Sequence, residues 1–152
     1  MVGPMMIGNV LTPDVVRLEL PGETKQQIIE SLLDILMETG KVENRQTALD
    51  ALLEREEKMS TGIENGIAIP HGKTEAVKEL AACIGLKKEG VDFDSLDGKP
   101  STIFIMTLSP KDKSGPHIQF LAEVSSLLKD EEGRNEILAA KTPKEVLDVI
   151  LR

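Results

Sequence analysis

The stretch STGIENGIAIPHGKT, residues 60–74, carries one of only two histidines in the chain. Its apolar run Ile67-Ala68-Ile69 has the length and the side chains of a short buried strand. Pro70 and Gly72, two residues typical of turns, flank His71 at the exit of that run. The pattern predicts a strand followed by a Pro-His-Gly turn that presents the imidazole with little side-chain bulk around it.

The second histidine, His117, directly follows Gly115-Pro116 at the start of an apolar pattern typical of a helix (Ile118, Phe120, Leu121, Val124, Leu127, Leu128). Free backbone N–H groups and the helix dipole favour an anion there and disfavour a protonated imidazole. A neutral ring nitrogen beside an anion site fits phosphoryl transfer to nitrogen. From their positions alone, a shared phosphoryl site and two unrelated histidines are equally good interpretations. In the second, one histidine lies in a surface turn and the other at a helix start.

The first half of the chain predicts helices with clear start signals. RLEL at 17–20 alternates like a short strand, and Thr24 with Gln27 has the spacing of a capping box before a helix that ends near Gly40. Asn44 can cap a second helix, whose inward face would hold Ala48, Leu49, Leu52 and Leu53. Arg55 then falls at the edge of that face and can point at a neighbouring loop.

Two uncharged apolar runs, AACIGL at 81–86 and STIFIMTL at 101–108, predict central strands joined by a polar linker. Thr142-Pro143 opens a last helix with a capping pattern and proline in its first turn. Helix and strand patterns thus alternate within a length typical of one domain. We expect an α/β (α+β) fold, a single domain with a mixed β-sheet flanked by helices.

Composition excludes several classes of function. The chain of 152 residues has a formal net charge of -8 and neither Trp nor Tyr, which opposes nucleic-acid binding. It contains no apolar run of membrane-spanning length and no secretory signal, so we expect a cytoplasmic protein without membrane insertion. The one cysteine, Cys83, excludes an internal disulfide and lies in an apolar run, so it should be a small core residue.

No metal or cofactor is expected from the residue pattern. Asp92, Asp94 and Asp97 lack the spacing and the terminal Glu of a calcium loop, and a solvated turn explains them better. A zinc hydrolase built on His71 and His117 would need a third ligand, but neither an HExxH motif nor paired cysteines are present.

STGIENGIAIPHGK resembles the active-site motif of the fructose/mannitol-type enzyme IIA domains of the bacterial phosphoenolpyruvate-dependent sugar phosphotransferase system, a group that includes nitrogen-regulatory IIA proteins. The resemblance extends to ALLEREEKMSTGI before this motif, and to GVDFDSLDGKP, HIQFLAEVSSLLKDEE and TPKEVLDVI after it. It covers nearly the whole chain from about residue 10. It therefore implies an enzyme IIA type-2 domain over residues 10–152, with residues 1–9 as an N-terminal extension.

The resemblance implies a role for three residues. His71 matches the histidine that is phosphorylated, His117 the second active-site histidine, and Arg55 the arginine of the phosphate site. Glu64 departs from the pattern, since many relatives have a small residue there. A hydrogen bond must hold the ring nitrogen of His71 that does not react, and a backbone carbonyl, Glu64 or Asn65 could supply it.

The implied function is that of a phosphohistidine carrier. The phosphocarrier HPr, or its nitrogen-branch equivalent, would dock on an apolar patch around AIPHG and give its phosphoryl group to His71. His71 would pass the group to a cysteine of enzyme IIB on a separate chain. The alternative is a nitrogen-regulatory phosphoprotein that binds target proteins according to the state of His71. A binding module that is not phosphorylated is a third hypothesis, which the presence of Arg55, His71 and His117 together disfavours.

Overall fold

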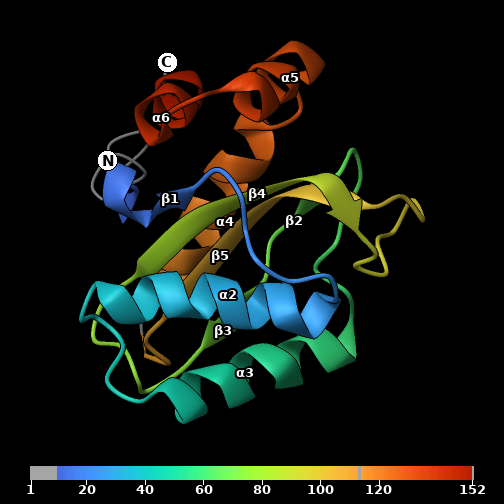
Figure 1. Ribbon diagram of the computed structural model, residues 1–152. Helices are drawn as coiled ribbons and strands as arrows, with labels where there is room; N and C mark the ends of the chain where they lie inside the picture. Colours follow the sequence, from blue (N-terminus) through green and yellow to red (C-terminus); the bar gives the residue numbers. More distant parts are fainter. Residues whose placement is uncertain (1–9, 113, 152) are drawn as a thin grey trace.

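A mixed five-stranded sheet lies between two groups of helices (Figure 1). The computed structural model describes residues 10–112 and 114–151, so the predicted extension 1–9 lies outside the described residues. The elements in chain order are η1 (Pro13–Val15), β1 (Val16–Arg17), α2 (Lys25–Glu38), α3 (Arg45–Lys58), β2 (Ile67–Ala68), β3 (His71–Lys73), β4 (Ala81–Val91), β5 (Ser101–Ser109), α4 (Ser114–Leu127), α5 (Glu131–Ala139) and α6 (Pro143–Leu151).

The two predicted central strands are confirmed as β4 and β5, which pair antiparallel through the centre of the sheet. β1 runs parallel to β4 on one side, and β2 and β3 run parallel to β5 on the other. β4 is longer than predicted, because it continues through residues 87–91 of the polar segment that the sequence indicated as a linker. The pairing is irregular between Leu86 and Val91, where the strand becomes more exposed and tolerates charged side chains.

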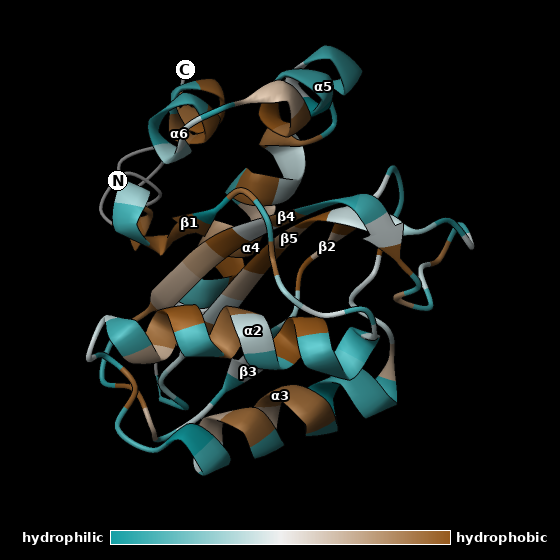
Figure 2. Cartoon of the chain, in the orientation of Figure 1, coloured by the Kyte–Doolittle hydropathy of each residue, from teal (hydrophilic) through white to brown (hydrophobic). Residues whose placement is uncertain are grey.

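α2 confirms the predicted capping box and packs its apolar face on β4. The Thr24 hydroxyl accepts a hydrogen bond from the Gln27 backbone N–H, and the Gln27 side chain accepts one from the Thr24 backbone N–H. The helix ends before Gly40, whose φ of 78° is easily adopted by glycine. Figure 2 shows the alternation of hydrophobic and hydrophilic residues along α2 beside the sheet.

α3 begins after Asn44, as predicted, and carries one of the three expected site residues. The Asn44 side-chain oxygen accepts a hydrogen bond from the Thr47 backbone N–H at 3.0 Å. Ala48, Leu49 and Leu52 are buried, and the helix packs against α2 and β3. The cap therefore fixes the start of the helix whose last turn contains Arg55.

We expect Asn44→Ala to lower the free energy of unfolding by about 1 kcal/mol, because it removes the acceptor for an N–H group at the start of α3. Urea denaturation followed by circular dichroism measures the change. Asn44→Asp is the matched control, since it keeps an oxygen acceptor at the cap. Equal loss in the two variants would contradict a role of the side-chain acceptor.

The helices after the second histidine differ in part from the prediction. α4 starts at Ser114, so Gly115 and Pro116 lie inside its first turn, where proline costs no helical hydrogen bond. α5 is a separate helix that the sequence interpretation missed, because its apolar periodicity is weak. Its start signal is Asp130, which accepts a hydrogen bond from the Gly133 N–H. α6 begins at Pro143 as predicted, after Thr142.

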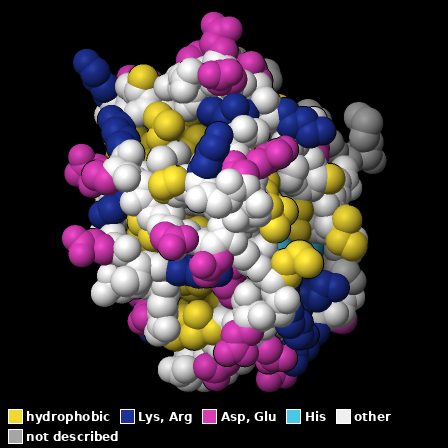
Figure 3. All heavy atoms as spheres, turned by 90° about the vertical axis from the view of Figure 1, so that its right-hand side faces the viewer, with side chains coloured by type: hydrophobic (Ala, Val, Ile, Leu, Met, Phe, Trp, Pro, Cys, Tyr) yellow, Lys and Arg dark blue, Asp and Glu magenta, His cyan; other side chains and the backbone are white. Residues whose placement is uncertain are grey.

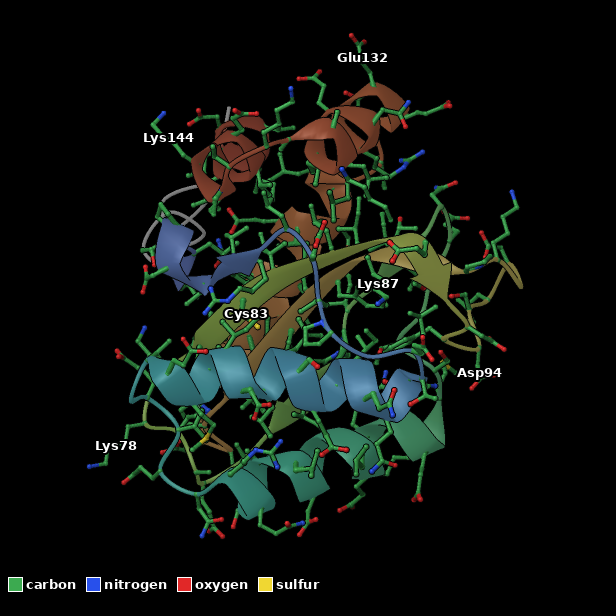
Figure 4. All side chains as sticks on the ribbon, in the orientation of Figure 1. Lys78, Cys83, Lys87, Asp94, Glu132 and Lys144 are labelled. Atoms are coloured by element: carbon green, nitrogen blue, oxygen red, sulfur yellow. The ribbon has the colours of Figure 1, made fainter. Side chains whose placement is uncertain are left out.

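Cys83 is buried on β4, as the apolar run around it predicts. Its Sγ lies 3.4 Å from the Leu32 carbonyl oxygen of α2, between that helix and the sheet (Figure 4). Burial raises the pKa of the Cys83 thiol well above its usual value, which leaves it a core residue without a reactive thiolate. None of the helices in the described part of the chain has the length and apolar character needed to cross a bilayer.

Candidate functional site

The three residues singled out from the sequence, Arg55, His71 and His117, line one cleft of about 520 Å³. They come from α3, β3 and the first turn of α4, three elements that meet at the end of β5. The apolar side chains of Ile118 and Leu121 form part of its wall. Figure 3 shows part of a histidine side chain among apolar side chains, with a group of Lys and Arg side chains close by.

His71 is the first residue of strand β3, and not part of the predicted turn. The strand that starts at Ile67 is interrupted, because the Ile69 N–H donates to the Thr61 carbonyl and Pro70 has no N–H to donate. Parallel pairing with β5 resumes at His71, which lies opposite Thr107. The histidine is thus held on a strand that pairs with β5 through backbone hydrogen bonds.

The His71 imidazole is fixed as one tautomer. Its Nδ1 lies 2.7 Å from the Ile69 carbonyl oxygen, which can only accept, so Nδ1 carries the proton and Nε2 has a free lone pair. Burial is the main cause that lowers the pKa of His71, and the Arg55 charge lowers it further. The Ile69 hydrogen bond and Glu56 act in the opposite direction. The ring is therefore neutral at pH 7 and can act as a nucleophile through Nε2.

Of the three groups considered for orienting His71, the structure uses a backbone carbonyl. Glu64 is exposed and lines a separate shallow hollow together with Ile63, Leu96 and Asp97. The Asn65 backbone N–H donates to Asp97, which lines that same separate hollow. The Glu64 carboxylate is thus not among the groups that line the His71 cleft.

His117 lies beside His71 and is almost fully buried, with 2% of its surface exposed. The two ring centroids are 5.5 Å apart, and the ring planes meet nearly edge to face at 82°. Nε2 of His117 lies 2.8 Å from the Thr107 hydroxyl and Nδ1 lies 2.6 Å from the Ser109 hydroxyl. Burial, followed by the charges of His71 and Lys73, lowers the pKa of His117 to about 4.

Arg55 reaches the cleft from the last turn of α3, at the edge position that the helical spacing predicts. Its Nη1 donates to the Met59 carbonyl at 2.7 Å and thereby caps the end of the helix. A guanidinium has five N–H donors in a planar fork, so donors remain for an anion in the cleft. Arg55 thus lines the same cleft as His71, with guanidinium N–H groups beyond the one that it donates to Met59.

Sequence reasoning missed the buried polar groups that act on the two histidines: Glu56 through its charge on His71, and two β5 hydroxyls through hydrogen bonds to His117. Glu56 is buried, and its carboxylate accepts from the Thr61 backbone N–H at 2.7 Å and the Thr61 hydroxyl at 2.5 Å. Lys25 pairs with the same carboxylate at 2.8 Å. The signal for Thr107 and Ser109 was present, since two hydroxyl residues on one face of an otherwise apolar strand must find a buried partner.

The lowered pKa values of His71 and His117 predict a loss of stability in acid. The unfolded chain, in which histidine titrates near 6.5, binds protons more readily than the folded one. Stability that is present above pH 6.5 should therefore fall as the pH drops toward the folded value of about 4 for His117. NMR titration of the imidazole C–H signals measures both pKa values directly. A pKa of 6.5 or higher for either ring would contradict this expectation.

Comparison with known proteins identifies the family of the chain. The family model described as phosphoenolpyruvate-dependent sugar phosphotransferase system, EIIA 2, matches residues 9–152. The PTS system fructose-specific EIIA component of Haloferax volcanii is 41% identical over 143 residues, which cover 93% of each chain.

Solved structures show the same fold. The nitrogen regulatory protein IIA-Ntr from Neisseria meningitidis superposes with a TM-score of 0.89 at 26% identity, over 95% of this chain and 99% of that one. The complex of enzyme IIAMtl and phosphorylated enzyme IIBMtl from Escherichia coli contains a chain that matches with a TM-score of 0.79 at 23% identity, over 93% and 98%. The chain therefore belongs to the EIIA type 2 family of the phosphoenolpyruvate-dependent sugar phosphotransferase system.

Proposed function

We propose that the protein is a phosphohistidine carrier that accepts a phosphoryl group on Nε2 of His71. The observation that carries the proposal is the hydrogen bond from Nδ1 to the Ile69 carbonyl, which leaves Nε2 unprotonated in a cleft shared with Arg55 and His117. The family is a component of a phosphotransferase system, which supplies the reaction class. We propose that the functional unit is the single domain 10–152.

The transfer needs no proton to leave His71. Nε2 attacks phosphorus in line, the phosphorus–nitrogen bond of the donor phosphohistidine breaks, and its electron pair returns to the donor imidazole. The His71 ring becomes cationic while it keeps the Nδ1–H donated to Ile69, and the carbonyl dipole stabilises that charge. Arg55 donates to the phosphoryl oxygens, which carry most of the negative charge in the transition state.

We propose phospho-HPr as the donor and a cysteine of enzyme IIB as the acceptor. EIIA domains of this system pair with IIB domains, as in the mannitol complex. Next to His117, the side chain of Ile118 is 64% exposed and lies on the wall of the cleft. An exposed apolar side chain at the rim supports a partner that docks directly over the phosphoryl group.

The test is a reconstituted relay. The protein is incubated with phosphoenolpyruvate, enzyme I and HPr, and its intact mass is measured. We expect the gain of one phosphoryl group, which is lost in acid and stable in alkali, as phosphoramidates are. A fructose-type IIB added afterwards should remove it. If the protein gains no phosphoryl group from a phospho-HPr preparation that labels a known EIIA domain, the proposed function is wrong.

A nitrogen-regulatory role is the second candidate. The similarity to IIA-Ntr favours it, because the fold agrees with that regulatory protein over nearly the whole chain. The two candidates share phosphorylation of His71 and differ in the fate of the phosphoryl group. Rapid transfer to a fructose-type IIB would support the transport role. Stable phosphorylation that changes binding to a target protein, without transfer to IIB, would support the regulatory role.

A further inference from the structure

Both ring nitrogens of His117 are already engaged by hydroxyl groups of β5. Nε2 contacts Thr107 Oγ1 at 2.8 Å and Nδ1 contacts Ser109 Oγ at 2.6 Å. Both hydroxyl residues are buried, with at most 1% of their surface exposed. If His117 is to bind a phosphoryl oxygen on His71, one of these two hydrogen bonds must open.

The lengths of the two contacts favour one of the two tautomers of His117. A neutral imidazole donates from one nitrogen and accepts at the other. Hydrogen bonds donated by O–H groups are on average shorter than those donated by N–H groups. The shorter contact therefore fits Ser109 as donor to Nδ1, and the longer one fits Nε2–H as donor to Thr107.

The strand register shows which of the two contacts lies next to the nucleophile. Thr107 is the direct partner of His71 across the parallel pair β3 and β5, so their side chains leave the sheet on the same face. Ser109 is the partner of Lys73, two residues further along the strand. Nε2 of His117, which contacts Thr107, thus lies on the side of the ring nearer to His71.

We propose that Ser109 is a positioning residue that keeps the proton of His117 on Nε2, and that Thr107 holds this N–H until a phosphoryl oxygen on His71 replaces the hydroxyl. This inference rests on the proposed phosphorylation of His71. The contact between Ser109 and Nδ1 of His117 persists through the transfer and keeps the ring in place. Before transfer, the Thr107 hydroxyl keeps the buried N–H of His117 paired. After transfer, the same N–H is available as a donor to the phosphoryl group.

The two hydroxyls then have unequal roles, which substitution can separate. Ser109→Ala removes the hydrogen bond that holds Nδ1 of His117, so both tautomers become accessible. Transfer to His71 should slow by about 10- to 100-fold, by analogy with groups that orient metal-binding histidines. Thr107→Val keeps the shape of the side chain and removes only the group that competes with the phosphoryl oxygen. Its transfer rate should stay closer to the parent rate than that of Ser109→Ala.

The experiment uses the full chain with purified phospho-HPr as donor. Single-turnover transfer rates are measured for the parent, Ser109→Ala, Ser109→Thr and Thr107→Val. Ser109→Thr keeps the hydroxyl and should recover most of the rate. The matched control is Ser101→Ala, because Ser101 is another buried β5 hydroxyl, bonded to Ser95 and absent from the His71 cleft. Urea denaturation shows that each variant is folded under the assay conditions.

Nitrogen-15 NMR of the histidine side chains provides a readout that a purely structural role would not change. In the parent we expect the proton of His117 on Nε2, a marked change at Nε2 on phosphorylation of His71, and little change at Nδ1. In unmodified Ser109→Ala the preference for the Nε2–H tautomer should weaken. An Nδ1–H tautomer in the parent, a parental rate in Ser109→Ala, or equal losses in Ser109→Ala and Thr107→Val would overturn the inference.

Failure of the proposed function is a separate result. A parent protein that takes up no phosphoryl group would contradict the role of His71. The tautomer of His117 in unmodified protein, with and without the Ser109 hydroxyl, would still decide whether Ser109 fixes the ring.

Discussion

His71→Ala should take up no phosphoryl group when incubated with phosphoenolpyruvate, enzyme I and HPr. His71 Nε2 is an imidazole nitrogen in the cleft with a free lone pair, because the other nitrogen of its ring donates to Ile69. Both nitrogens of His117 are occupied by the hydroxyls of Thr107 and Ser109. Among the described residues, His117 is therefore a poor substitute for the lost nucleophile, and intact-mass analysis should show only unmodified protein.

The control for this experiment is His117→Ala, which keeps the nucleophile. It should still become labelled on His71, more slowly than the parent, since the expected role of His117 is support and not attack. Urea denaturation of His71→Ala must show a folded protein, because His71 also pairs with β5. Labelling of folded His71→Ala to the parental extent would place the phosphorylation site elsewhere.

Arg55→Ala should slow transfer to His71 by roughly a hundred- to a thousandfold, which corresponds to about 3 to 4 kcal/mol of transition-state stabilisation. Arg55 comes from the last turn of α3 and lines the cleft with His71, where its planar fork can bind two phosphoryl oxygens at once. Arg55→Lys should recover only part of the loss, because lysine keeps the charge without the fork. Single-turnover transfer from phospho-HPr measures the rates.

Loss of the Arg55 side chain has a second consequence that needs a control. Its Nη1 caps α3 by donating to the Met59 carbonyl, so Arg55→Ala also weakens the end of the helix. Urea denaturation separates this loss of stability from the loss of rate. Lys58→Ala is the matched variant, because Lys58 lies in the same turn and lines the same cleft. If Lys58→Ala and Arg55→Ala slow transfer equally, charge alone accounts for the effect.

Much of the architecture could be predicted because its signals are local. Thr24 with Gln27, and Asn44, mark helix starts by hydrogen bonds to backbone groups three residues away, and the structure confirms both. The uncharged runs that form β4 and β5 are long enough to be recognised without their neighbours. Weak periodicity hid α5, although Asp130 marks its start.

The candidate site was predictable only in part. His71 could be located from its proline and glycine neighbours, and Arg55 from its position on the helix. The pairing of His71 with Thr107 in a strand could not be predicted. It depends on the hydrogen bonds that the Ile69 N–H and the Pro70 carbonyl make with distant residues. Likewise, Glu56 looks like any other charged residue of a polar helix until Thr61 and Lys25 surround it.

The order of residues alone specifies the type of fold, the starts of the capped helices and the positions of the two histidines. Helix caps and hydrophobic periodicity involve residues only a few positions apart, so they can be recognised in the sequence without the tertiary structure. The packed molecule was needed to show which nitrogen of each histidine carries the proton. That choice depends on the Ile69 carbonyl for His71 and on the β5 hydroxyls for His117. Because a ring tautomer is set by the group opposite it in space, it appears only when β3, β5 and α4 are packed together.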